Sequence, residues 1–109
     1  MTAKQTIDRD FERSVAEGVT LVDFNASWCG PCRAQEPILR DLEKTYAGRA
    51  TVTAIDIDAH QALAFALGIQ SIPTLIIFKD GKEKKRFIGL QSGATLSDAL
   101  QPIVDRTAE

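Results

Sequence analysis

Apolar residues along the chain follow two different spacings, and the change of spacing predicts where strands and helices lie. Residues 19–24 form a short, β-branched and apolar run of the kind that favours a buried strand. From Cys29 onward Ala34, Ile38 and Leu42 recur at four-residue steps, which is typical of the buried face of a helix. The sequence therefore predicts a strand that leads directly into a long helix.

The rest of the chain repeats this alternation. The segment at residues 4–7 carries too sparse an apolar signal to be assigned, and Asp8 is expected to cap a first helix that ends at Gly18. The further elements are expected in the order strand (50–58), helix (60–67), hairpin (75–78 and 83–88, turning at Asp80 and Gly81) and a last helix from Thr95. Because strands and helices alternate early and a hairpin comes late, we expect a mixed sheet, parallel first and antiparallel at the last edge.

Two prolines fall inside the expected helices. Pro37 is expected to kink the long helix, because proline cannot donate a hydrogen bond to the preceding turn. The last helix has Asp98 three residues after Thr95, as in a capping box, but Pro102 means that this helix must kink or begin later.

Length and composition describe an ordinary globular chain. Its 109 residues indicate one domain over 1–109, and 44% hydrophobic with 26% charged residues is usual for a soluble protein. A formal net charge of −2 argues against nucleic acid or an anionic membrane as a partner. The polar N-terminus lacks a signal-peptide core and no apolar run is long enough to span a bilayer, so we expect a cytoplasmic protein.

Both cysteines, Cys29 and Cys32, stand within four residues where the expected strand meets the helix. A tetrahedral zinc site needs four ligands, whereas one chain offers two thiols and the distant His60, so metal binding would require a dimer that shares two such pairs. A structural bridge across so small a loop would constrain the unfolded chain very little. A redox-active dithiol remains, and it suits a cytoplasm in which structural disulfides are rare.

A helix N-terminus gives the first cysteine a physical reason to react. Unpaired backbone N–H groups and the helix dipole stabilise an anion there, which lowers a thiol pKa from its free value of about 8.5. We therefore expect Cys29 to be the nucleophile and Cys32, one turn inside the helix and more shielded from solvent, to be the resolving thiol. Pro31 suits the first turn because it has no N–H to leave unpaired.

The segment Trp28-Cys29-Gly30-Pro31-Cys32, which follows Val22-Asp23-Phe24, resembles the active site of the thioredoxin family. Further landmarks keep the family's relative spacing: the segment 71–75 resembles its cis-proline loop, 79–81 its late hairpin turn, and Gly89 its glycine facing the dithiol. The resemblance covers nearly the whole chain. It implies a thioredoxin-like fold, α/β with a mixed central sheet flanked by helices on both faces, and places strand 19–24 near the middle of that sheet.

Asp23 is implied by the resemblance to be a buried acid that exchanges protons with Cys32. A carboxylate within an apolar strand is costly to bury in its ionised form and therefore holds its proton more tightly. The alternative is an outward-facing Asp on a half-exposed strand. Family members usually carry a tryptophan where this chain has Asn25, and often a lysine beside the acid where it has Ala54; loss of that cation would raise the proton affinity of Asp23 further.

The resemblance also implies a surface for substrates around the dithiol. A cis peptide bond before Pro73 would present the backbone of Ile72 next to Cys29, free to pair with an extended substrate segment. The implied contact surface consists of Trp28, Gly30, Pro31, Ile72, Pro73 and Gly89. For Trp28 and Ile72 the alternative is simple core packing.

Motif and resemblance together imply a protein disulfide reductase that carries electrons by reversible exchange between the Cys29–Cys32 pair and disulfides of substrate proteins. It would need no bound cofactor or metal beyond this redox-active disulfide, would be re-reduced by a thioredoxin reductase, and is expected to be a monomer. The pair Gly30-Pro31 resembles reducing members of the superfamily, whereas oxidases and isomerases typically place a histidine there. A disulfide isomerase or oxidase, and a thioredoxin-like docking module without redox turnover, stay open as alternatives.

Overall fold

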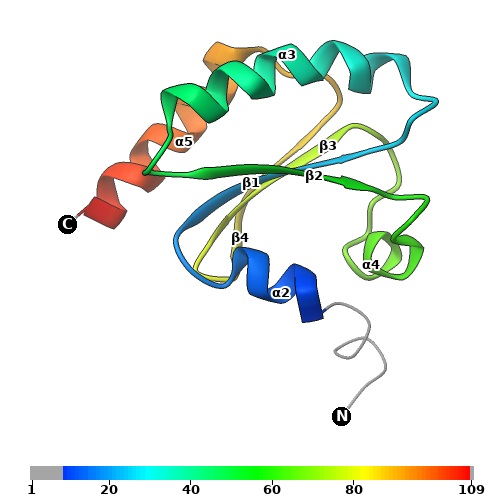
Figure 1. Ribbon diagram of the computed structural model, residues 1–109, viewed down its shortest axis with the longest axis horizontal. Helices are drawn as coiled ribbons and strands as arrows, with labels where there is room; N and C mark the ends of the chain where they lie inside the picture. The colour runs from blue at the N-terminus through cyan, green and yellow to red at the C-terminus, as the bar shows by residue number, and fades with distance from the viewer. Residues whose placement is uncertain (1–8, 109) are drawn as a thin grey trace.

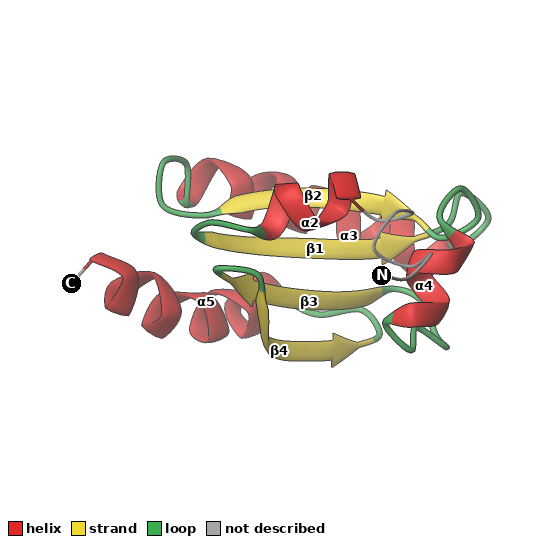
Figure 2. Cartoon of the chain, turned by 90° about the horizontal axis from the view of Figure 1, so that it is seen from below, coloured by secondary structure: helices red, strands yellow, loops and turns green. Residues whose placement is uncertain are grey.

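The computed structural model describes the backbone of residues 9–108 and the side chains of residues 9–106. The unassigned segment at 4–7 and the expected cap at Asp8 lie outside the described residues. Four strands form one sheet in the order β2-β1-β3-β4, as Figure 2 shows from below. The strands are β1 (Val19–Asn25), β2 (Thr51–Asp56), β3 (Thr74–Lys79) and β4 (Lys82–Ile88).

The sheet is mixed, as the order of elements along the chain predicts. Strand β1 runs parallel to β2 and antiparallel to β3, and β3 runs antiparallel to β4. The hairpin between β3 and β4 turns at Asp80 (φ 51°) and Gly81 (φ 84°), a pair of left-handed conformations that suits a two-residue hairpin turn. Within the described sheet β1 is therefore an inner strand, which confirms the position that the family resemblance implies.

Helices cover both faces of the sheet. Figure 1 shows α3 (Gly30–Thr45) and α5 (Gly93–Ala108) on one face, and α2 (Arg9–Val15) and α4 (Gln61–Ala66) on the other. Strand β1 leads into α3 at the right of that view, so the dithiol segment lies at the carboxyl end of an inner strand. That end of an open α/β sheet is where ligands usually bind.

The alternation of side chains along β1 supplies both halves of the hydrophobic core. Val19 and Leu21 point toward α3 and α5, whereas Val22 and Phe24 point toward α2 and α4. Each fully buried leucine or phenylalanine contributes roughly 2–3 kcal/mol relative to an exposed one. Period-two alternation then places Asp23 on the same face as Leu21, beneath α3.

Helix α3 buries most of the stripe that its apolar spacing predicts, including Leu39 and, just after the helix, Tyr46, but one position differs. Leu42 is buried and Ile38 half-buried as expected, but Ala34 is exposed and Gln35, at 0% exposure, takes its place. The prediction for Ala34 is wrong because a methyl group gains little from burial, whereas the Gln35 amide finds two backbone partners in the core. Pro37 lies inside the helix on its exposed side, and its expected kink stays a prediction.

Helix α5 begins two residues before Thr95, so the expected capping box at Thr95 is wrong. The Ser92 hydroxyl accepts the Thr95 backbone N–H at 3.1 Å, and the Ser92 carbonyl accepts the Leu96 N–H at 3.1 Å. Ser92 therefore satisfies a backbone donor that the first helical turn leaves unpaired. Pro102 remains within α5, and the alternative of a later start is also wrong.

Candidate active site

Cys29 and Cys32 lie at the start of α3, which follows β1 in the chain, and they form a disulfide with a Cα–Cα distance of 5.3 Å. Cys29 is the N-cap of α3 in extended conformation, and Pro31 falls in the first turn as expected. The Cys32 backbone N–H donates to the Cys29 sulfur at 3.2 Å. The first turn of the helix thus directs a backbone donor at the sulfur atom that would carry the negative charge of a thiolate.

The two cysteines are buried to nearly the same extent. Cys29 is 5% exposed and Cys32 is 4% exposed, so in the disulfide form the expected difference in shielding is almost absent. Both pack with Ala26 in a small apolar cluster, against which Ile72 lies half-buried. What distinguishes the two sulfurs is their partners: the Cys29 sulfur accepts a backbone N–H from the first turn of α3, whereas Cys32 is the third residue of that helix and supplies this N–H.

The loop before β3 lies directly against the dithiol. The Ile72–Pro73 peptide bond is cis, as expected, and the Ile72 carbonyl oxygen is 3.9 Å from the Cys29 sulfur. Gly89, with φ at +94°, donates its backbone N–H to the Pro73 carbonyl at 2.8 Å. The loop at residues 72–73 therefore lies against Cys29 and is hydrogen-bonded to Gly89, whose backbone conformation is one that side-chain-bearing residues rarely adopt.

Trp28 is a surface residue, 65% exposed, so the alternative of core packing is wrong for it. Its indole N–H donates to the Asp58 carboxylate at 2.9 Å, which fixes the ring beside the dithiol. Neither the spacing of apolar residues nor the family landmarks indicate Asp58. The same holds for Ile88 and Leu90, which flank Gly89 and are 66% and 48% exposed.

Asp23 is buried at 1% exposure, so the outward-facing alternative is wrong. The Asn25 side-chain N–H donates to its Oδ2 at 3.2 Å, whereas Oδ1 has no hydrogen-bond partner among the described residues. Burial raises the pKa of Asp23 from its ordinary 3.8 to about 6; the Asn25 hydrogen bond opposes this rise, and the negative charge of Glu36 adds to it. Ala54 pairs with Asp23 across the sheet, and it supplies no charge there.

Two hollows open on either side of Asn25. One, of about 180 Å³, is lined by Asp23 and lies between α3 and β2; the other, of about 400 Å³, is lined by Cys32. Asn25 and Glu36 line both. Asp23 and Cys32 therefore line two different hollows, each large enough to admit water.

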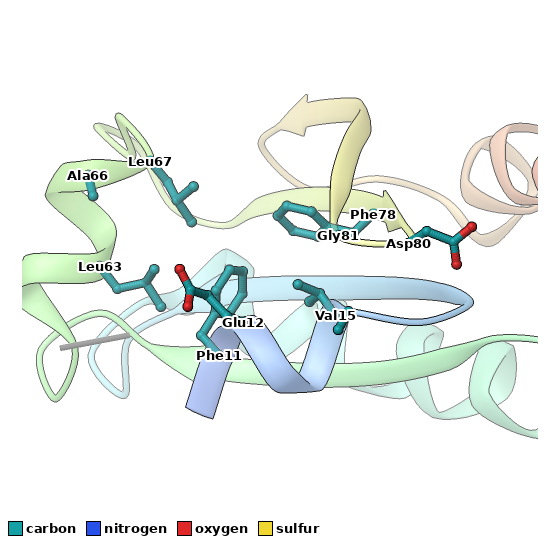
Figure 3. Close-up of a pocket in the computed structure, with 10 residues that line it drawn as sticks. Phe11, Glu12, Val15, Leu63, Ala66, Leu67, Phe78, Asp80 and Gly81 are labelled. Atoms are coloured by element: carbon teal, nitrogen blue, oxygen red, sulfur yellow. The ribbon is translucent and has the colours of Figure 1, made fainter. Parts of the chain in front are cut away.

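A further hollow, of about 410 Å³, lies on the face of the sheet that α2 and α4 cover (Figure 3). It is lined mainly by apolar side chains of α2, α4 and β3, among them Phe11, Val15, Leu63 and Phe78. None of the site residues expected from the sequence lines it. The chemistry of the protein is therefore concentrated at the junction of β1 and α3.

The described part of the chain holds no group of three or more His, Cys, Asp or Glu side chains arranged to bind a metal ion. His60 is an exposed residue at the N-cap of α4. In the same part of the chain, no helix combines the length and the apolar character that crossing a membrane requires.

A CxxC pair at a helix N-terminus, at the carboxyl end of an inner strand and against a cis-proline loop, defines a thiol–disulfide oxidoreductase. Known proteins agree. The family model described as Thioredoxin matches residues 2–102. Thioredoxins of the Staphylococcus aureus strains Mu50 and MW2 are each 40% identical over 100 residues, which cover 92% of this chain and 96% of theirs. A solved structure, a single-site mutant of thioredoxin from Halobacterium salinarum NRC-1, matches with a TM-score of 0.81 and 36% identity, covering 88% of this chain and 84% of that one.

The chain belongs to the thioredoxin family. It is a protein disulfide reductase whose redox-active pair is Cys29 and Cys32, and it works by reversible dithiol–disulfide exchange. The expectations for fold and reaction, drawn from the motif and the landmarks around it, are both confirmed.

Proposed function

We propose that Cys29 attacks the substrate and Cys32 resolves the product. The Cys29 thiolate forms a bond to one sulfur of the substrate disulfide, and the other substrate sulfur leaves as a thiolate. Cys32 then loses its proton and attacks the Cys29 sulfur, which closes the Cys29–Cys32 disulfide and releases the second substrate sulfur. Two electrons pass from the dithiol to the substrate. The observation that carries this assignment is the Cys32 N–H directed at the Cys29 sulfur from the first turn of α3.

Asp23 is the proposed proton acceptor for Cys32, directly or through water. Its burial and its pKa of about 6 favour this role, because a base that titrates near neutral pH can both take and return a proton. Asp23 lines one hollow and Cys32 lines the next, and both hollows have Asn25 and Glu36 in their walls, which supports a proton path through water at this side of α3.

Substrates are proposed to bind as an extended segment along the loop before β3. The Ile72 carbonyl, 3.9 Å from the Cys29 sulfur, belongs to a backbone that can pair with such a segment as an added strand. The apolar contacts would come from exposed Trp28 and Pro31 together with half-buried Ile72. Gly30 and Gly89 would add backbone contacts, and Pro73, which is buried, would shape the loop. Recognition through backbone and a small apolar patch accepts many sequences, which suits a general reductase.

The remaining proposals concern the cellular setting. We infer that a thioredoxin reductase restores the dithiol, that residues 1–109 act as one domain and as a monomer in the cytoplasm, and that no cofactor or metal is bound. Membership of the thioredoxin family supports the reductase and the disulfide-containing protein substrates as partners. The Gly30-Pro31 pair, without a histidine, favours reduction over the isomerase or oxidase alternative.

Trapping the mixed disulfide tests the assignment of the two cysteines. Cys32→Ser leaves an attacking thiol without a resolving one, so it should accumulate a covalent complex with a disulfide-containing protein such as insulin. Cys29→Ser, the matched control, should trap nothing above background, because Cys32 lies inside the helix. Intact-mass analysis of both variants after incubation shows which cysteine forms the complex, and a complex formed through Cys32 would reverse the assignment. In a separate test, full biological activity of a variant lacking both thiols would favour the docking module.

A further inference from the structure

Asn25 lies two residues after Asp23 on β1, and its side-chain amide is within hydrogen-bonding distance of two Asp23 oxygens. Its side-chain Nδ2 donates to the Asp23 Oδ2 at 3.2 Å and lies 3.4 Å from the Asp23 carbonyl oxygen. Among the described residues no other side chain donates to this carboxyl group. The amide is half-buried and has two acceptors on one neighbour, so its orientation is tied to that of the acid.

The two oxygens of the Asp23 carboxyl are consequently not equivalent. Oδ2 accepts the Asn25 N–H, and a proton on Oδ2 would compete with that hydrogen bond. Oδ1 is buried and has no partner in the described structure, so it is free to hold a proton. Oδ2 can therefore accept from Asn25 in both forms of the acid: the neutral acid carries its proton on Oδ1, and the ionised acid carries none.

We propose that Asn25 is a positioning residue that assigns the exchangeable proton of Asp23 to Oδ1 and stabilises the ionised carboxylate. This inference rests on the proposed role of Asp23 as proton acceptor for Cys32. In that step the Cys32 S–H proton moves to Oδ1, directly or through water, as the Cys32 sulfur bonds to Cys29 and the substrate thiolate leaves. The proton later returns to solvent or to the departing thiolate.

The charges around Asp23 make the Asn25 donor important. Helix α3 brings Glu36, Arg40 and Glu43 to the hollow over the acid, and Glu36 raises the pKa of Asp23. The neighbouring strands contribute no charge at this level, since Ala54 of β2 and Leu75 of β3 lie opposite Asp23 in the sheet. The further charged groups, Arg33 and Asp56, line the hollow on the Cys32 side.

Within the described residues no ion pair reaches Asp23, because the only pairs found there join Arg13 to Asp10 and Arg86 to Glu83. A neutral amide is thus the single direct donor that favours the ionised form of the acid. Its removal should raise the pKa of Asp23 above about 6, by roughly one pH unit, because a hydrogen bond to the charged carboxylate is stronger than one to the neutral acid. At pH 6 a rise of one unit would lower the ionised fraction about fivefold.

The decisive measurement is the titration of Asp23 by the ¹³C shift of its carboxyl carbon, in reduced and in oxidised protein. Asn25→Leu, which keeps the branching of the side chain at Cγ but has no donor, should raise the midpoint, and Asn25→Ala repeats the test if the larger leucine does not fit. Asn25→Gln keeps an amide donor and should return part of the shift. Thr53→Val is the matched control, since Thr53 lines the same hollow from β2 without donating to Asp23. An unmoved midpoint in the leucine and alanine variants, or an equal shift in Thr53→Val, would overturn the inference.

A kinetic arm separates this inference from the role on which it rests. The rate at which Cys32 releases substrate from the mixed disulfide is measured from pH 5 to pH 8, both in protein that retains Asp23 and in the Asp23→Asn variant. Asn25→Leu should shift the midpoint of the pH–rate profile to higher pH when Asp23 is present and should leave it unchanged in the Asp23→Asn background. A merely structural effect would not depend on Asp23 in this way. If Asp23→Asn leaves the release rate unchanged, Asp23 is not the proton acceptor for Cys32, and the assignment of an exchangeable proton to Oδ1 fails with it. The effect of the Asn25 hydrogen bond on the pKa of Asp23 is judged separately, by the titration.

Discussion

Gln35 and Gln91 clamp the active-site helix to the loop that follows β4. The Gln35 side chain is fully buried, its amide N–H donates to the Gln91 carbonyl at 2.9 Å, and its amide oxygen accepts the Gln91 backbone N–H at 2.8 Å. The Gln91 side chain in turn donates to the Gly89 carbonyl at 3.2 Å. The Gly89 backbone N–H donates to the Pro73 carbonyl, so a chain of hydrogen bonds runs from α3 to the cis-proline loop beside Cys29.

Replacing Gln35 should cost both stability and substrate binding. Gln35→Ala removes two hydrogen bonds from the Gln91 backbone and leaves a cavity, and we expect a loss of about 3 kcal/mol in the free energy of unfolding. The KM for a protein disulfide should rise more than kcat falls, because the loop carrying Gly89 loses its support. Denaturant titration and insulin-reduction kinetics measure both effects. Gln70→Ala, at an exposed position, should stay within about 0.5 kcal/mol of the parent; an equal loss there would contradict the clamp.

Asp23 should make the protein less stable as the pH rises from about 4 to about 6. In that interval the unfolded chain has already released the proton of this residue, ordinary pKa 3.8, while the folded protein keeps it up to about 6. The unfolded state therefore binds fewer protons, and the free energy of unfolding falls with pH until it levels off above about pH 6. The difference between the two pKa values corresponds to about 3 kcal/mol at neutral pH.

Asp23→Asn tests this account because it removes the titrating group while keeping the shape of the side chain. The variant should be more stable than the parent at pH 7 and should lose most of the decline between pH 4 and pH 6. Asp98→Asn, at an exposed carboxylate of α5, should show the parent's pH dependence. Urea unfolding across this range supplies the comparison, and a parent whose stability rises from pH 4 to pH 6 would speak against a raised pKa.

Trp28 should contribute more to substrate binding than to folding. Its ring is 65% exposed and hydrogen-bonded to Asp58, so Trp28→Ala removes little buried area. We expect the KM for insulin to rise about tenfold, which corresponds to the loss of one aromatic contact of about 1.4 kcal/mol. Asp58→Ala frees the ring without removing it and should raise KM less. Phe65→Ala is the matched control, because Phe65 is an exposed aromatic on α4; a similar rise there would show that the effect is not specific to Trp28.

Much of the site could be predicted because it depends on local sequence. The strand at 19–24 and the dithiol at the start of the next helix follow from adjacent residues, and alternation along β1 places Asp23 on the face of Leu21. The cis bond before Pro73 and the position of Gly89 required the family resemblance, since spacing alone does not indicate either. The pattern within an element was sufficient for β1 and for most of α3, but it failed at Ala34, which is exposed.

The residues that escaped prediction depend on partners elsewhere in the chain. Gln35 is buried because Gln91, 56 positions later, offers a backbone donor and acceptor, and nothing near Gln35 in sequence indicates this. Asp58 becomes part of the site only because the fold brings it to Trp28. Asn25 stood out only as a departure from the family pattern, and its function toward Asp23 required the hydrogen-bond geometry.

The most direct test of the central claim is the equilibrium of the Cys29–Cys32 pair against glutathione and dithiothreitol buffers, with insulin reduction measured in the same preparation. Trp28, the single tryptophan and the neighbour of Cys29, offers a fluorescence signal for the redox state. We predict a pair more reducing than glutathione, together with catalytic turnover of insulin disulfides. A pair markedly more oxidising than glutathione, or no measurable exchange at all, would contradict the assignment as a disulfide reductase.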